Sequence, residues 1–303
     1  MKNELLILIP TYNEIENVEE ILSQILGLEL PADILFIDDN SPDGTGDKLE
    51  QLAEKYSNIS VSHRKGKLGI GSAHEDGINF AYNHSYRLLL TMDCDFSHSP
   101  SEIKDFIKLA EQADIVIGSR FLKKGSLKEW NFLRWSLTHI GHIATRLLLN
   151  MPYDASGAFR LYRLDKISRY FLDNIHSRGY SFFYESLYVL HLNEYRIVEI
   201  PIILPARVYG HSKMRIKDAI QSLLQLLKIY FITKLNYGNF VITEPIISEN
   251  KIIDTQGWDG YWGDNTNNLI LYIYGLVAAF YRKFIIKPSL NHFIYKYFNR
   301  ESK

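Results

Sequence analysis

Strands and helices alternate along the first 120 residues, and this alternation restricts the fold more than any other feature of the sequence. Continuous aliphatic runs such as "ELLILIP" and "DILFIDD" are typical of strands that are buried on both faces of a sheet. Segments with apolar residues at helical spacing separate them, as in "NEIENVEEILSQILG", where Asn13 and Glu16 predict an N-terminal capping box. This order predicts a mostly parallel sheet with helices on both faces.

The pattern changes after about residue 120 and again after about residue 235. Residues 127–150 and 213–234 are expected to be helices, and "DASGAFRLYR" is expected to be a loop or a short strand. Residues 236–303 are rich in Asn, Tyr, Ile and Lys. We therefore expect one α/β domain over residues 1–235, followed by a helical tail over residues 236–303.

The composition argues against several classes of protein. Of the 303 residues 46% are hydrophobic and 23% are charged, which suits a large buried core. The formal net charge of −1 argues against nucleic-acid binding, which usually requires a basic excess. One cysteine allows no intrachain disulfide, which fits a reducing compartment. Because the apolar runs are too short, we expect no signal peptide and no transmembrane helix, and we expect a cytoplasmic protein.

Polar clusters follow four of the predicted strands. They lie at residues 10–14, 38–43, 93–98 and 118–120. In a parallel sheet the carboxyl ends of the strands meet at one edge, and ligands bind in the crevice outside that edge. The sequence therefore predicts a binding site at this edge.

Asp93 and Asp95 end one of these strands. In an extended segment both side chains point to the same side, where the two carboxylates repel each other. Mg²⁺ or Mn²⁺ would relieve this repulsion, and such ions commonly bridge carboxylates and substrate phosphates. The alternative is that one aspartate caps the helix near Pro100 and that the other is solvated. The pair alone does not distinguish a metal–phosphate enzyme from a simple cation site.

Seven motifs occur in order over residues 7 to 214: "IPTYNEIENV", "IDDNSPDGTGD", "KLGIGSAHEDGINFA", "MDCDFSHSP", "IGSRF", "SGAFRLYR" and "EIPIILPARVYGHSKM". Together they resemble glycosyltransferase family 2, in particular its dolichol- or polyprenol-phosphate mannosyltransferase group. The resemblance covers roughly the first 235 residues. It implies a GT-A fold and the inverting transfer of a hexose from a nucleotide sugar, typically GDP-mannose, to a polyprenyl or dolichyl phosphate.

The resemblance also implies roles for individual residues. Those expected in the nucleotide pocket are Pro10, Tyr12, Glu14, Asp38 and Asp39. Those expected at the metal are Asp93, Asp95 and Ser97. The catalytic set adds four basic residues near the donor diphosphate or the acceptor phosphate, namely Arg120, Arg134, Arg207 and Lys213. Two positions depart from the family pattern, His211 in place of an acidic residue and Ala158 in place of Gly.

The implied acceptor simplifies the chemistry. A phosphate monoester has a second pKa near ~6 and is mostly dianionic at neutral pH. Such a nucleophile has no proton to lose, so we expect no dedicated general base. The protein would align the reactants and stabilise charge, with arginines clamping phosphate.

For several residues a structural explanation stands beside a role in the site. Arg134 lies in an aromatic segment, where its aliphatic stem would cover apolar surface. Arg160 and Arg163 are equally well explained as fold-supporting ion pairs. For Glu185, a role in positioning the site from below and a buried structural carboxylate are equally good explanations. His98 is better explained by a turn before a helix than by substrate contact, and Cys94 by a place in the core.

A lipid acceptor implies contact with a membrane. The segment 213–234 is amphipathic with basic ends, and residues 272–298 are aromatic and basic, as in interfacial helices. The alternative for the first segment is a helix packed on the domain. The tail also resembles the lead-in to a class I methyltransferase domain without its nucleotide loop, so it is either a remnant or a membrane- or partner-docking segment, and no methyltransferase activity is expected.

Other functions remain open. A family member of this kind could instead use UDP-glucose or another UDP-sugar, or a glycan acceptor, although a hydroxyl acceptor would require a general base. A catalytically silent binding relative is a third possibility. A dinucleotide-binding oxidoreductase is disfavoured because "PTYNE", and not G-x-G-x-x-G, follows the first strand.

Overall fold

The computed structural model describes residues 3–127, 130, 132–204, 216–243, 247–248 and 251–252. The chain divides into two compact units, Met1–Glu244 and Pro245–Lys303. Among the described residues of the second unit, β8 (Ile247–Ser248) and β9 (Lys251–Ile252) form an antiparallel pair. The predictions for residues 253–303, including the methyltransferase-like lead-in, lie outside the described residues.

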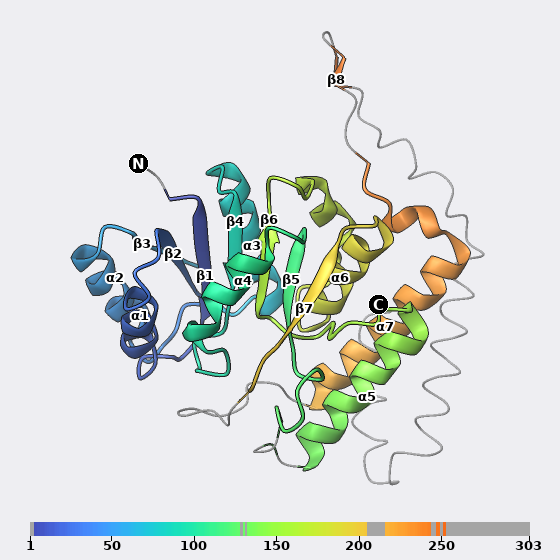
Figure 1. Cartoon of the computed structure of the whole chain (residues 1–303), viewed down its shortest axis with the longest axis horizontal. Helices are drawn as coiled ribbons and strands as arrows, with labels where there is room; N and C mark the ends of the chain where they lie inside the picture. Colours follow the sequence, from blue (N-terminus) through green and yellow to red (C-terminus); the bar gives the residue numbers. More distant parts are fainter. Residues whose placement is uncertain are drawn as a thin grey trace, which may run out of the picture. The chain divides into compact units, whose positions relative to one another are not determined.

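The first unit is built on a seven-stranded sheet with the order β3-β2-β1-β4-β6-β5-β7 (Figure 1). Its strands are β1 (Leu5–Thr11), β2 (Ala32–Asp38), β3 (Ile59–His63), β4 (Leu88–Thr91), β5 (Ile115–Ser119), β6 (Arg160–Arg163) and β7 (Ile197–Pro201). Only β6 among these strands runs antiparallel to its neighbours. The prediction of a mostly parallel sheet is confirmed, and "FRLYR" supplies its antiparallel member.

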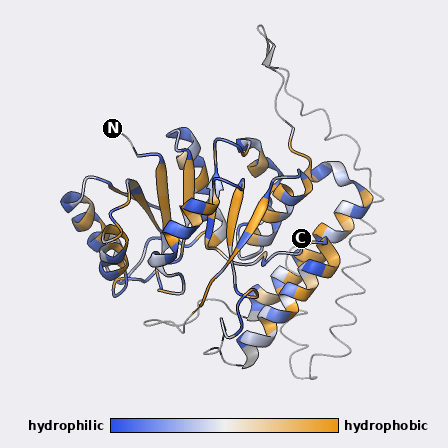
Figure 2. Ribbon diagram, in the orientation of Figure 1, coloured by the Kyte–Doolittle hydropathy of each residue, from blue (hydrophilic) through white to orange (hydrophobic). Residues whose placement is uncertain are grey.

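Helices cover both faces because side chains alternate along each strand. One face packs against α1 (Val18–Leu26), α2 (Thr45–Lys55) and α4 (Ile103–Leu109). The other packs against α3 (Ile70–Asn83) and α6 (Ser181–Leu192). In Figure 2 the strands are largely hydrophobic, whereas most helices carry hydrophilic residues on one side.

Two further helices extend the second of these layers. They are α5 (Phe132–Leu149) and α7 (Ile216–Leu235), and α7 contacts both α5 and α6. Leu226 and Ile229 of α7 are buried in the core. The structure therefore shows α7 packed on the domain, which was the alternative to membrane contact considered for residues 213–234. Short 3₁₀ turns complete the unit at Pro100–Glu102, Arg169–Asn174 and Tyr237–Phe240.

The start of α1 differs from the prediction. The helix begins at Val18, and Asn13 lies in the preceding loop with a positive φ of 54°. The Glu14 carboxylate accepts a hydrogen bond of 2.6 Å from Asn17 Nδ2 within this loop. The predicted capping box at Asn13 and Glu16 is therefore wrong, because the chain turns at Asn13 before the helix begins.

Helix α2 was not predicted, since its first residues form part of the turn-rich stretch "NSPDGTGD". Asp43 explains where it begins. The Asp43 Oδ1 atom accepts hydrogen bonds from the Thr45 N–H and from Thr45 Oγ1, at 3.0 and 2.6 Å. The helix then buries Leu49 and Leu52, which are three residues apart.

The strand order places the crevice for ligands. From β1 the chain adds β2 and then β3 on one side, and it then crosses to β4 on the other side of β1. Such a reversal opens a crevice at the carboxyl ends of the two strands that flank it. The residues that follow β1, β2 and β4 are therefore close together. Among the described helices, none is both long enough and apolar enough to cross a membrane.

Candidate active site

The two aspartates that follow β4 lie in a bend. The strand ends at Thr91, so Asp93 and Asp95 do not share the phase of an extended strand as predicted. Asp95 is buried, and its Oδ1 accepts the Ser97 N–H at 3.1 Å. The Asp93 side chain is about one-third exposed (33%). The bend thus leaves the Asp93 carboxylate partly exposed and buries the Asp95 carboxylate.

His98 holds this bend in place. Its Nδ1 accepts the Asp93 N–H at 2.9 Å, so Nδ1 carries no proton and the ring is the neutral tautomer with hydrogen on Nε2. The ring is buried and stacks on Phe159, with centroids 4.8 Å apart. Phe96 has a positive φ of 60°, which turns the chain back toward β4. Cys94 is buried in the core beneath the bend.

The donor set of the bend suits a hard divalent cation. Carboxylate oxygens are the ligands that Mg²⁺ and Mn²⁺ prefer. Within the described part of the chain, no three His, Cys, Asp or Glu side chains gather as a ligand cage. Asp93 and Asp95 therefore fit an ion that takes its other ligands from water and from a substrate phosphate.

Asp38 ends β2 and is almost fully buried. Its Oδ2 accepts the Ser41 N–H at 2.9 Å, and its Oδ1 accepts a hydrogen bond from Thr11 Oγ1 at 3.0 Å. These bonds fix the turn after β2 and tie it to the end of β1. Asp38 thereby positions the backbone that carries its neighbour, Asp39.

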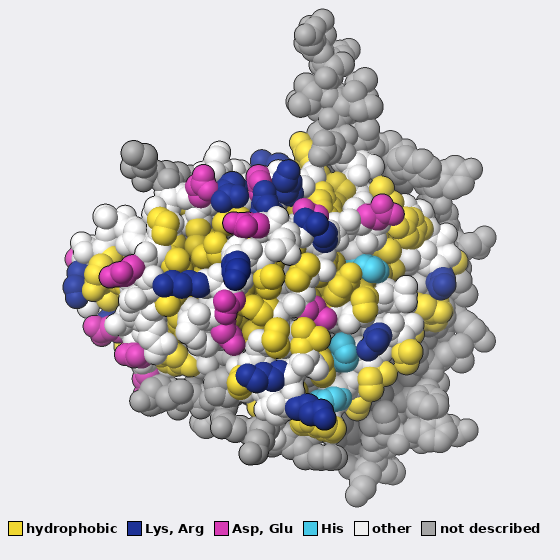
Figure 3. Space-filling model, viewed as in Figure 1, with side chains coloured by type: hydrophobic (Ala, Val, Ile, Leu, Met, Phe, Trp, Pro, Cys, Tyr) yellow, Lys and Arg dark blue, Asp and Glu magenta, His cyan; other side chains and the backbone are white. Residues whose placement is uncertain are grey.

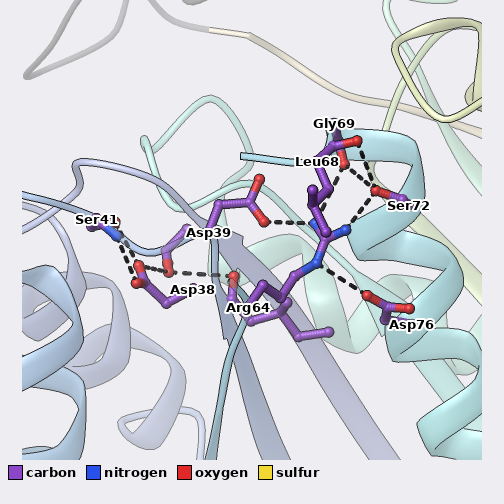
Figure 4. A network of polar contacts seen from close by, with 10 residues as sticks. Asp38, Asp39, Ser41, Arg64, Leu68, Gly69, Ser72 and Asp76 are labelled. Carbon is purple, nitrogen blue, oxygen red and sulfur yellow. Dashed lines mark hydrogen bonds and ion pairs between the residues drawn. The ribbon is translucent and has the colours of Figure 1, made fainter. Parts of the chain in front are cut away.

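Asp39 points away from that turn toward Arg64, a residue that the sequence did not single out (Figure 4). Arg64 Nη1 donates to Asp39 Oδ1 at 2.6 Å, and Nη2 donates to Ser72 Oγ at the same distance. Arg64 Nε lies 3.1 Å from Asp76 Oδ2. Burial raises the pKa of Asp39 above its usual value, and the Arg64 guanidinium opposes that effect. The only signal in the sequence is the basic run "RKGK" just after β3.

The end of β1 lies beside the end of β2, which carries Asp39. Pro10 and Tyr12 are partly exposed there, and the Lys67 ammonium lies 4.3 Å above the Tyr12 ring. Glu14 follows, and its backbone N–H donates to Thr45 Oγ1 at 2.9 Å. The register pairs Thr11 with Asp38. The five residues predicted for a nucleotide pocket thus lie on two adjacent strand ends, although their contact with a nucleotide stays a prediction.

Arg120 follows β5 and forms a buried ion pair with Asp154. Both Nε and Nη2 donate to the Asp154 carboxylate, with an Nε–Oδ2 distance of 2.7 Å. Burial alone would lower the pKa of Arg120, but Asp154 and the nearby Asp93 together raise it. The same ion pair lowers the pKa of Asp154 against the opposing effect of burial. Asp154, which was not predicted, therefore fixes the Arg120 guanidinium beside the aspartate bend.

The other three basic residues are placed differently. The Arg134 guanidinium lies 3.6 Å from the centroid of the Trp130 ring near the start of α5. Arg207 and Lys213 lie outside the described residues, as does His211. The catalytic roles expected for all four basic residues stay predictions.

Buried charges elsewhere support the backbone. Arg160 is fully buried and donates to the carbonyl oxygens of Gly157, Ala155 and Phe183. It therefore supports the backbone through these hydrogen bonds and not through the ion pair considered above. Arg163 does pair with Asp165, at 2.6 Å. Ala158 contributes its carbonyl, which accepts a hydrogen bond from Thr91 Oγ1 at 2.6 Å.

Known proteins resemble this chain over more than two thirds of its length. An undecaprenyl-phosphate mannosyltransferase of Micrococcus luteus is 35% identical over 210 residues, which cover 69% of this chain and 86% of that protein. A polyprenol monophosphomannose synthase of Mycolicibacterium smegmatis is 34% identical, over 69% of this chain and 80% of that protein. Among solved structures, mannosyl-3-phosphoglycerate synthase from Rubrobacter xylanophilus matches with a TM-score of 0.49 and 16% identity, over 81% of this chain and 78% of the other.

The family assignment follows from these matches. The sequence profile of glycosyl transferase family 2 matches residues 6–171, which span β1 to the 3₁₀ turn after β6 and include the aspartate bend, Asp39 and Arg120. The chain is therefore a glycosyltransferase and belongs to glycosyl transferase family 2.

Proposed function

We propose that this protein transfers mannose from GDP-mannose to a polyprenyl or dolichyl phosphate, with inversion at the sugar carbon and with Mg²⁺ or Mn²⁺. The names of the two relatives above support the sugar and the class of acceptor. The observation that carries the proposal is the set of strand ends around β1, where the Asp39 carboxylate follows β2 and the Asp93 carboxylate, which follows β4, lies near the Arg120 guanidinium that follows β5. A nucleotide sugar offers a base and ribose for one side of this crevice and a diphosphate for the other.

The donor would lie along the strand ends. Asp39, held by Arg64, would accept hydrogen bonds from the base or the ribose, and Pro10, Tyr12 and Glu14 would line the pocket with Asp38 behind them. Asp93 and Asp95, with Ser97 beside them, would hold the metal ion. The ion would supply positive charge that neutralises the diphosphate leaving group.

The acceptor phosphate would attack the sugar directly. One of its oxygens forms a bond to the anomeric carbon as the bond from that carbon to the diphosphate breaks, and the electron pair leaves with the nucleoside diphosphate. A dianionic phosphate needs no general base. Arg120 would stabilise the anionic groups, and because Asp154 fixes its guanidinium in advance, little reorganisation is needed during the reaction. Arg134, Arg207 and Lys213 complete the proposed basic set.

A lipid acceptor requires the enzyme to reach a membrane. On α5, large apolar side chains are exposed at three- and four-residue spacing, at Leu137, Ile140, Ile143 and Leu147. This spacing places them on one face of the helix. Figure 3 shows hydrophobic side chains over α5 at the lower right, interspersed with histidines and basic residues. We propose that this face contacts the membrane peripherally, on its cytoplasmic side.

A transfer assay tests the proposal. Purified protein is incubated with Mn²⁺ or Mg²⁺, a short polyprenyl phosphate, and either GDP-mannose or UDP-glucose, and the sugar that enters the organic phase is measured. We expect metal-dependent transfer from GDP-mannose that Asp95→Ala abolishes and that Asp105→Ala, an exposed aspartate on α4, leaves unchanged. Transfer from UDP-glucose alone would overturn the choice of donor. Binding of both nucleotide sugars without lipid product would overturn the proposed acceptor and favour a glycan acceptor or a silent relative.

A further inference from the structure

Glu185 is a buried carboxylate that the proposed reaction does not use. It lies in α6 and is 1% exposed. Its Oε1 accepts the His176 N–H at 3.2 Å, and its Oε2 accepts the Ser177 N–H at 2.9 Å. Both oxygens therefore bind the backbone of the segment just before the helix. Glu185, in the second turn of α6, thus ties residues 176 and 177 to that helix, and the Phe182 N–H bond to the Gly179 oxygen ties the end of the segment 175–179 to it.

The same segment packs against the start of α3. The Arg178 carbonyl oxygen accepts the Ser72 N–H at 3.1 Å. A Cβ atom at Gly71 would lie 2.7 Å from the Gly179 oxygen and 2.5 Å from Phe182 Cβ. The two backbones thus touch at a position where only glycine fits. A shift of residues 175–179 must therefore be transmitted to the first turn of α3.

The first turn of α3 in turn holds Arg64. Ser72 Oγ accepts the Arg64 Nη2–H at 2.6 Å and lies 2.9 Å from the Gly69 oxygen, to which it donates. Arg64 then donates to Asp39 at 2.6 Å, as Figure 4 shows. The Arg64 and Asp39 side chains are 7% and 9% exposed. Little room is left for either side chain to adjust independently of Ser72.

We infer that Glu185 is a positioning residue for the donor nucleotide, acting through residues 176–178, Ser72 and Arg64 on Asp39. This inference rests on the proposed function, in which Asp39 binds the base or the ribose. The contacts form a continuous path of packed backbone and charge-assisted hydrogen bonds from α6 to the crevice. Glu185 itself touches neither substrate.

The chemistry of the side chain gives the test. Glutamine has nearly the same shape, but it has one acceptor oxygen, and its NH₂ group would face a backbone N–H. Glu185→Gln therefore leaves one buried N–H without an acceptor and loosens residues 176–177. Donor affinity should fall about five- to tenfold, in the range that packed networks transmit, while kcat at saturating donor and KM for the acceptor stay within about twofold.

The decisive measurement is a double-mutant cycle on the full chain. The Kd for GDP-mannose is measured by calorimetry for the wild type, Glu185→Gln, Asp39→Asn and the double variant. We expect Asp39→Asn to weaken binding and Glu185→Gln to cause no further loss in that background. Tyr188→Phe is the matched control, because it removes a hydrogen bond from α6 to Thr233 of α7, which is not part of the path to Asp39. It should lower stability and leave donor affinity unchanged.

The outcomes separate the inference from the proposed function. If Asp39→Asn alone leaves donor affinity unchanged, the proposed nucleotide pocket is overturned, and this inference with it. If Asp39→Asn weakens binding but Glu185→Gln has no effect, or acts with full additivity, the positioning role is overturned and the pocket stands. Should Glu185→Gln fail to fold, Ser72→Ala interrupts the same path nearer the site and must show the same loss in donor affinity and the same non-additivity with Asp39→Asn.

Discussion

The acid sensitivity of the fold should depend on one histidine. His74 in α3 is 1% exposed and packs against the rings of Phe182 and Phe183, with centroid distances of 6.0 and 4.9 Å. Burial is the main cause that lowers its pKa from 6.5 to about 3, and the nearby positive charge of Arg160 acts in the same direction. The unfolded chain binds a proton at this residue near pH 6.5, whereas the folded chain does not. Between these two values the unfolded state therefore binds more protons, and stability falls as the pH falls.

The magnitude follows from one proton. Each pH unit below the unfolded pKa costs about 1.4 kcal/mol, so the His74 contribution to the free energy of unfolding drops by about 2 kcal/mol between pH 7 and pH 5. His74→Gln cannot titrate in this range. We expect urea unfolding at the two pH values to show that the variant loses about 2 kcal/mol less than the wild type between them.

The matched control is His84→Gln, at the exposed end of the same helix. This variant should keep the acid-dependent loss of the wild type. An identical loss of stability in His74→Gln and the wild type would refute the reasoning, because it would mean that His74 takes up its proton equally well in the folded and unfolded states.

Three further predictions follow from the same contacts. Gly71→Ala should destabilise the protein by about 1–3 kcal/mol, because the new methyl group meets Phe182. Gly66→Ala should be tolerated, because nothing lies within 4 Å of the added atom. Equal urea midpoints for the two variants would contradict this prediction. Asp154→Asn leaves the buried Arg120 charge uncompensated, so it should lower the free energy of unfolding by about 3–5 kcal/mol. A measured loss below about 1 kcal/mol would contradict this prediction. Chelation with EDTA should stop sugar transfer without altering the circular dichroism spectrum, and added Mn²⁺ should restore it; transfer that persists in EDTA would exclude the proposed metal role.

The sheet could be predicted from the sequence because burial on both faces leaves a strong local signal. The runs at β1 and β2 consist almost entirely of aliphatic residues, and their burial is nearly complete. The beginnings of α1 and α2 could not be predicted so well. They depend on a positive φ at Asn13 and on hydrogen bonds from Thr45 to Asp43, which apolar spacing does not report.

The candidate site could also be predicted in part, because its residues follow strands that leave a local signal in the sequence. The rule that ligands bind at strand ends selected the clusters at residues 38–43, 93–98 and 118–120, and the family resemblance then singled out Asp39 and Arg120 within them. The partners of these two residues were missed because they are distant in sequence. Arg64 is 25 positions from Asp39, and Asp154 is 34 positions from Arg120. No periodicity encodes such pairs, since the packing of the whole domain brings them together.

The antiparallel strand β6 has a consequence for how the protein folds. Within the described sheet, β6 alone is hydrogen-bonded to both β4 and β5, and it joins the group β3-β2-β1-β4 to the group β5-β7. Asp93 follows a strand of the first group and Arg120 follows a strand of the second. The four residues of β6 pair with strands that begin 72 and 45 positions earlier in the chain, and contacts of such long range form late in folding. The aspartate bend and the guanidinium therefore reach their final separation only when β6 is in place between the groups. A local opening of β6 would therefore be enough to remove enzymatic activity.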